Sequence, residues 1–99
     1  MPPLTKATKF FKYAGVWRYK IWGEEAVQLV DTRALENILG VVGGPRVVVF
    51  RDTGKPTAPK LRIEIHNGFI AGASVAMDDT TPLHEGVQVT EFIVRPLAN

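Results

Sequence analysis

Apolar and polar residues alternate along the N-terminal stretch 9–23, which carries six of the nine aromatic residues and four of the twelve cations of the chain. This period of two predicts a strand with one buried face. The stretch is long for one straight strand, so Gly15 is expected to mark a bulge, a bend or a short turn between two strands. If the alternation is continuous, one side holds the expected core, Phe11, Tyr13, Trp17, Tyr19 and Ile21, and the other side holds Lys12, Arg18, Lys20 and Trp22.

The following segment changes from a turn to a helical pattern. Residues 23–25 predict a hairpin connection into a short strand over 26–30. Asp31 and Thr32 form an N-cap signal, after which a helix of about nine residues is expected. Its end is expected at Gly40 or Gly43 in a left-handed conformation, because Pro45 prevents continuation. The apolar stripe of this helix consists of Leu35, Ile38, Leu39 and Val42.

The C-terminal half is predicted to consist of strands and loops. Residues 46–52 form a continuous apolar run typical of a central strand, and residues 53–59 an irregular loop with two prolines and a glycine. Residues 60–66 alternate and lead into Asn67-Gly68, the strongest short hairpin signal. A two-residue turn there pairs His66 with Phe69, Glu64 with Ala71 and Arg62 with Ala73.

The return strand of this hairpin, residues 69–77, contains mostly small side chains. Small side chains allow close approach, so the helix or a second subunit is expected to lie over this strand; alanines on a solvated face are the alternative. An acidic loop over 78–86 and a last strand over 87–94, with a bulge near Thr90-Glu91, complete the expected elements.

Together the elements predict an α+β fold. We expect a mostly antiparallel sheet of five or six strands with one short helix packed on one face, in the order strand, strand, helix and then four strands. A small, partly open β-barrel is the alternative. The 99 residues are expected to form a single domain, because two cores would each be too small to be stable. Residues 1–8, with two prolines, are expected to form a flexible N-terminal arm.

Catalytic chemistry has little support in the sequence. The absence of cysteine removes thiolate nucleophiles and cysteine metal sites. The one serine, Ser74, lies inside a strand pattern, and His66 and His84 lie next to turns, where exposed polar residues are common. We therefore expect no enzyme, no cofactor and no metal site. We recognise no known family, and the lack of a long apolar segment predicts a soluble, cytoplasmic protein.

Charge is segregated along the chain, although the formal net charge is only +2. Residues 1–22 carry five cations and no acid, and residues 45–66 carry five cations and two acids. The segments 23–44 and 67–99 each carry one cation and four acids. Such segregation can focus a positive field on one surface. Alternatively, neighbouring strands pair the opposite charges.

Cations and aromatic rings in one region favour binding of single-stranded DNA or RNA, because cations displace counterions from phosphates and rings stack on unpaired bases. A homodimer would double the basic surface. The alternative is a structural or adaptor subunit that binds a protein partner or itself through a sheet face or edge strand. The expected nucleic-acid-binding residues are Lys12, Arg18, Lys20, Trp22, Arg51, Lys55, Lys60 and Arg62.

Overall fold

The structure, a computed structural model, describes residues 5–52, 54, 58–77 and 88–91. The described part contains one short helix and a mostly antiparallel sheet, which confirms the α+β class. The elements are β1 (Thr5–Tyr13), β2 (Val16–Ile21), β3 (Val27–Leu29), α1 (Thr32–Leu39), β4 (Arg46–Phe50), β5 (Lys60–His66), β6 (Phe69–Ala76) and β7 (Gln88–Glu91).

The predicted strand number and order along the chain are wrong, because the described residues form seven strands, three before α1 and four after it. Their spatial order is β3-β2-β1-β6-β5-β4-β7. The additional strand arises at Gly15, where a turn divides the first stretch into β1 and β2. The first strand begins at Thr5, so residues 5–8 of the expected arm belong to it. In the described residues, β3 and β7 end the ladder and do not pair with each other, so the ladder is open.

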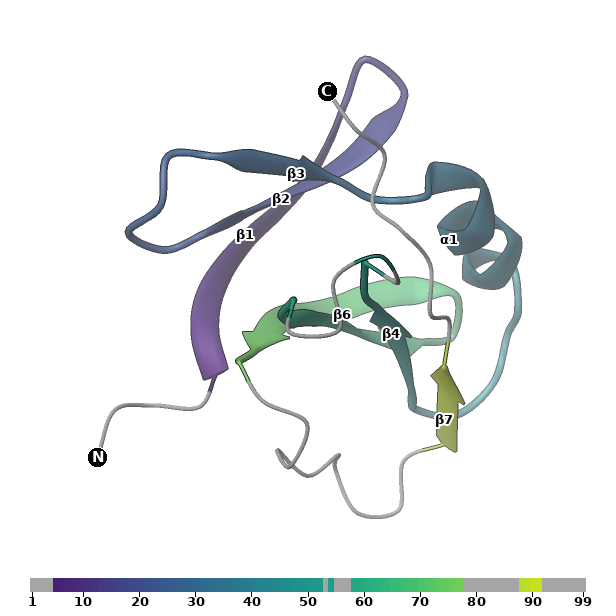
Figure 1. The fold of residues 1–99 in the computed structure, drawn as a ribbon. Coiled ribbons are helices and arrows are strands. Elements are labelled where there is room, and N and C mark those ends of the chain that lie inside the picture. The colour runs from purple at the N-terminus through teal and green to yellow at the C-terminus, as the bar shows by residue number, and fades with distance from the viewer. Residues whose placement is uncertain (1–4, 53, 55–57, 78–87, 92–99) are drawn as a thin grey trace.

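Strand β1 connects two parts of this ladder. Residues 5–7 pair with β6, whereas residues 8–13 pair with β2. Figure 1 shows β1 curving away from β6 and carrying the β1–β2 hairpin and β3 over the remaining strands. All strand pairs are antiparallel except β4 with β7, which is parallel. The β1–β2 hairpin is therefore held at its base by β6 and projects from the rest of the sheet.

The turn between β1 and β2 changes the predicted faces. Ala14 and Gly15 have φ values of 51° and 78° and form the two-residue connection that suits a tight hairpin. Tyr13 therefore lies opposite Val16, and the alternation does not continue across the turn. Residues directly opposite each other share a face of the sheet. The prediction that Phe11 and Tyr13 belong to the core is wrong, because they lie on the other face from Tyr19.

The core gathers side chains from strands and helix. All four residues from Val47 to Phe50 are buried, which confirms the apolar run as a central strand. The buried cluster combines side chains from β2, β4, β5, β6 and α1 with that of Val30. It consists of Tyr19, Ile21, Val30, Leu35, Ile38, Val48, Phe50, Leu61, Ile63, Ile65 and Val75. Burial of a large apolar side chain contributes about 1.5–3 kcal/mol, so this cluster holds the β1–β2 hairpin and α1 onto the sheet.

The start of α1 and its end at Gly40 are as predicted, but the conformation of that end is not. The side chain of Asp31 accepts a hydrogen bond from the backbone N–H of Ala34 at 3.0 Å, which confirms the N-cap. Gly40 ends the helix with φ −80°, and the described glycines with positive φ are Gly15, Gly23 and Gly68, so the predicted left-handed cap is wrong. Because the helix stops at Leu39, Val42 leaves the apolar stripe and is 77 % exposed.

The second hairpin has the predicted turn but a shifted register. Asn67 and Gly68 have φ values of 52° and 81°, and His66 lies opposite Phe69 as expected. An irregularity at Glu64/Ile65 then places Glu64 opposite Gly72. The expected pairs of Glu64 with Ala71 and Arg62 with Ala73 are therefore wrong, because one extra residue on β6 moves its partners by one position; Arg62 lies opposite Ser74.

The turn of this hairpin touches the segment that follows α1. The backbone N–H of Asn67 donates to the carbonyl of Gly43 at 3.1 Å. A Cβ added at Gly68 would lie 2.6 Å from the carbonyl oxygen of Leu39. The acidic loop 78–86 lies outside the described residues, as does most of the loop 53–59. The pairing of β7 with β4 runs without a shift through Thr90 and Glu91, so the described residues show no bulge at these two positions. No helix in the described ranges has the length and apolarity needed to cross a membrane.

Candidate nucleic-acid interface

One face of the β1–β2 hairpin combines cations with aromatic rings, and we call it the outer face. The register places Lys9 opposite Lys20, Phe11 opposite Arg18 and Tyr13 opposite Val16. These six residues share one side of the hairpin. Neither β1 nor β2 contains an acidic residue. The outer face therefore presents three cations and two rings on a single two-stranded surface.

The rings of the outer face lie close to its cations. Lys9 Nζ is 5.6 Å from the centroid of the Phe11 ring, and the guanidinium carbon of Arg18 is 5.6 Å from that of Tyr13. Arg18 Nε also donates to the carbonyl oxygen of Tyr13 at 3.5 Å. Tyr13 is 68 % exposed, so its ring is open to a ligand. Each such cation–ring contact is worth about 0.5–1 kcal/mol at an exposed site and favours this arrangement of the two residue types.

The contribution of Lys9, Phe11 and Tyr13 to this face was missed from the sequence. The signal that could have found it is Gly15, since a two-residue turn at that position reverses the alternation. Phe11 and Tyr13 then join Arg18 and Lys20, while Lys12 moves to the opposite side. Rings and cations, which are mixed along the sequence, therefore also lie side by side on the outer face.

Lys12 makes a different contact, on the side of the hairpin opposite to the outer face. Its Nζ donates to Glu36 Oε1 of α1 at 2.6 Å, and Trp17 Nε1 donates to the same oxygen at 3.1 Å. Trp17 stacks on Phe10 with ring centroids 4.8 Å apart and an angle of 4° between the ring planes. The hydrogen bond from Lys12, then that from Trp17, lowers the pKa of Glu36 below its usual value. Lys12 thus helps to attach α1 to the hairpin and does not share a face with Arg18 and Lys20.

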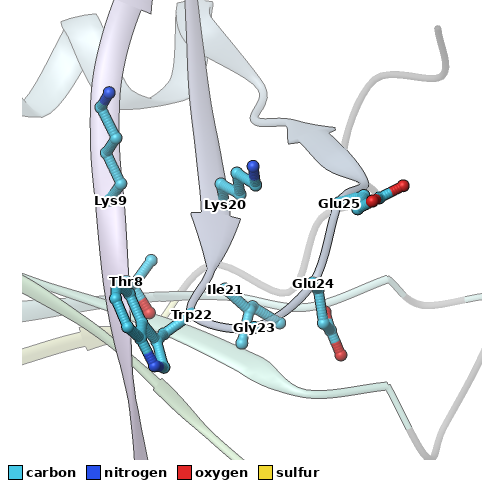
Figure 2. A pocket seen from close by; sticks show the side chains of 8 residues that line it. All are labelled: Thr8, Lys9, Lys20, Ile21, Trp22, Gly23, Glu24 and Glu25. Carbon is cyan, nitrogen blue, oxygen red and sulfur yellow. The ribbon is translucent and has the colours of Figure 1, made fainter.

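Trp22 follows the end of β2 and is 81 % exposed. It lines a hollow of about 690 Å³ that adjoins the outer face at Lys9 and Lys20. The described residues that line it are Thr8, Lys9, Lys20, Ile21, Trp22, Gly23, Glu24 and Glu25 (Figure 2). Burial raises the pKa of the nearby Tyr19 hydroxyl, with smaller contributions from the negative charges of Glu24 and Asp52. The hollow is thus lined by two cations, two carboxylates and an indole ring.

The described members of the second predicted group of cations, which are the candidate residues from segment 45–66, do not form an open surface. Lys60 is 8 % exposed and Arg62 is 7 % exposed, so both side chains are buried in β5. Arg51 is half-buried after the end of β4. Lys55 lies outside the described residues. The structure therefore brings together Arg18, Lys20 and Trp22 of the predicted set and places the described members of the second group elsewhere.

The two described residues that were considered for catalysis, Ser74 and His66, are separated along the second hairpin. Ser74 is half-buried in β6, His66 is exposed at the end of β5, and His84 lies outside the described residues. Within the described ranges, no group of three or more histidine and acidic side chains is placed to hold a metal ion. Comparison of the chain with protein-family models, curated proteins and solved structures gives no significant match.

Proposed function

We propose that the protein binds single-stranded DNA or RNA, without catalysis, through the outer face of the β1–β2 hairpin. The observation that carries the proposal is the turn at Ala14 and Gly15, which places rings and cations on the same face. Phosphates of a bound strand would displace counterions from the cations, and unpaired bases would stack on the rings. This arrangement is indifferent to base sequence, because every base has a flat face.

The spacing of the rings suits this mode of binding. Phe11 and Tyr13 are two positions apart on β1, so their rings rise from the sheet about 7 Å apart. Two neighbouring bases that are unstacked from each other can therefore each contact one ring. Lys9, Arg18 and Lys20 lie beside the rings, where the backbone of the strand would pass.

Fluorescence anisotropy with a labelled oligonucleotide of about ten nucleotides tests the proposal. If three phosphates are neutralised, log Kd should rise with log salt with a slope of about 2, because each phosphate on a single strand contributes about 0.7. Lys9→Ala, Arg18→Ala and Lys20→Ala should each weaken binding and lower this slope by about 0.7. Arg33→Ala is the matched control, since Arg33 is an exposed cation on α1, away from the outer face.

Two results would refute electrostatic binding of nucleic acid, and a third would exclude the outer face as its site. One is the absence of binding at a salt concentration of about 50 mM, where electrostatic binding is strong. The other is binding that does not weaken as salt is raised. A decrease caused equally by Arg33→Ala and Arg18→Ala would show attraction by the whole protein and would exclude the outer face as the site.

A second candidate function is that of a structural subunit that self-associates. The supporting observation is a group of exposed apolar side chains where the end of α1 meets the second hairpin: Val41 is 46 %, Val42 77 % and Phe69 77 % exposed. Light scattering after size-exclusion chromatography distinguishes the two functions. This candidate is supported if the protein is a dimer that does not bind nucleic acid and that dissociates in the double variant Val42→Ser with Phe69→Ser. A monomeric protein excludes it.

A further inference from the structure

The hollow beside Trp22 differs chemically from the outer face that it adjoins. Its floor includes Ile21, which is buried, and its wall includes the exposed indole of Trp22. The loop from β2 to β3 closes it, with Gly23 at φ 87° and the N–H of Glu24 donating to the carbonyl of Ile21 at 3.0 Å. In Figure 2, Trp22 lies beside Thr8 at one end of the hollow, and Glu24 and Glu25 lie at the other end, along the loop that follows Gly23.

The four charged side chains of the hollow are open to an incoming ligand. Lys20 and both glutamates are exposed, as is Lys9. In the described part of the chain, neither lysine forms a salt bridge with either glutamate. The volume of about 690 Å³ lies within the range of about 300–1,000 Å³ typical of small-molecule sites. The hollow is therefore large enough for one nucleotide.

We propose that this hollow receives one base of the bound strand and selects bases that carry an exocyclic amino group, and this inference rests on the proposed function. The indole of Trp22 offers a stacking surface. Lys9 and Lys20 lie where the phosphates on either side of that base would pass. An ionised carboxylate only accepts hydrogen bonds, so Glu24 and Glu25 favour an amino group and repel a carbonyl oxygen at the same position of the base.

Cytosine and uracil form the matched pair for the test, because the amino group of cytosine replaces a carbonyl oxygen of uracil. Affinities of labelled oligo(dC) and oligo(dU) of equal length are measured at neutral pH. We expect oligo(dC) to bind about tenfold more tightly, within the range for discrimination by polar contacts to a base edge. Trp22→Ala should weaken binding of both oligonucleotides by about tenfold, as expected for the loss of one stacked base.

The double variant Glu24→Ala with Glu25→Ala tests whether these two carboxylates cause the preference for an amino group. It should bring the affinity ratio of oligo(dC) to oligo(dU) close to one, and it should strengthen oligo(dU) binding because a repulsion is removed. Glu24→Gln with Glu25→Gln adds N–H donors beside the accepting oxygens, so it should also bring the affinity ratio close to one. Equal gains for both oligonucleotides in the alanine variant would show a general effect of charge and would overturn the inference.

The failure of this inference is distinguishable from the failure of the proposed function. Salt-dependent binding of both oligonucleotides with equal affinity would overturn the base selection and leave the outer face as the binding surface. A preference that persists in the alanine variant would also overturn it. No binding of either oligonucleotide would overturn the proposed function and, with it, the selection.

Discussion

The close approach of the second hairpin to α1 gives a sharp prediction about stability. At Gly68 the backbone has φ 81°, and an added Cβ would lie 2.6 Å from the carbonyl oxygen of Leu39. Gly68→Ala therefore has two costs: about 1–2 kcal/mol for a side chain in the left-handed region and about 1–3 kcal/mol for the displacement of packed groups. The expected loss in the free energy of unfolding is about 2–5 kcal/mol.

Gly15→Ala is the matched control for this substitution. Gly15 has a similar φ of 78°, but an added Cβ would meet nothing within 4 Å. It should therefore show only the conformational cost of about 1–2 kcal/mol. Urea unfolding of both variants gives the difference, and thermal unfolding should separate them further, since each kcal/mol shifts Tm by about 4–8 °C in a domain of this size. Equal losses in the two variants would refute the packing of the turn against α1.

Two further predictions concern the attachment of α1. Asp31→Ala removes the acceptor for the Ala34 N–H and should lower the free energy of unfolding by about 0.5–2 kcal/mol. Asp31→Asn keeps an accepting oxygen and should lose much less of this free energy. Equal losses in the two variants would contradict the cap. The pKa of Glu36 is lowered in the fold, so its contribution is present above its unfolded value near 4.5 and is lost as pH falls through the folded value. Glu36→Gln should therefore reduce stability at neutral pH and flatten the acid side of the stability profile. An unchanged acid profile would show that the contact with Lys12 and Trp17 contributes nothing.

Features encoded by a few neighbouring residues could be predicted from the sequence. Asn67 and Gly68 both tolerate positive φ, so their turn follows from local chemistry. Asp31 caps α1 by reaching a backbone N–H three residues ahead. The run from Val47 to Phe50 could be recognised because a strand that is buried on both faces carries a continuous apolar run. These parts depend little on the rest of the chain.

Features set by register could not be predicted. Ala14 adopts φ 51°, a conformation that alanine rarely takes, so the sequence gives only a weak signal for the turn. The predicted assignment of residues to the two faces of the β1–β2 hairpin is wrong for this reason. The small side chains around Ala71 do not fix a register, so the irregularity in β6 had no signature. The burial of Lys60 and Arg62 depends on the packing around β5 and not on its alternation. Each of these errors moved candidate site residues between faces.

The most direct test of the central claim is the salt dependence of single-strand binding by Phe11→Leu with Tyr13→Leu. This variant keeps the apolar character and every cation of the outer face and removes both rings. Stacking on an aromatic side chain is worth about 1–3 kcal/mol per base, so affinity should fall at least about tenfold at every salt concentration. The slope with log salt should be unchanged, because the number of neutralised phosphates is the same. Unchanged affinity in this variant would contradict the claim that the outer face binds unpaired bases.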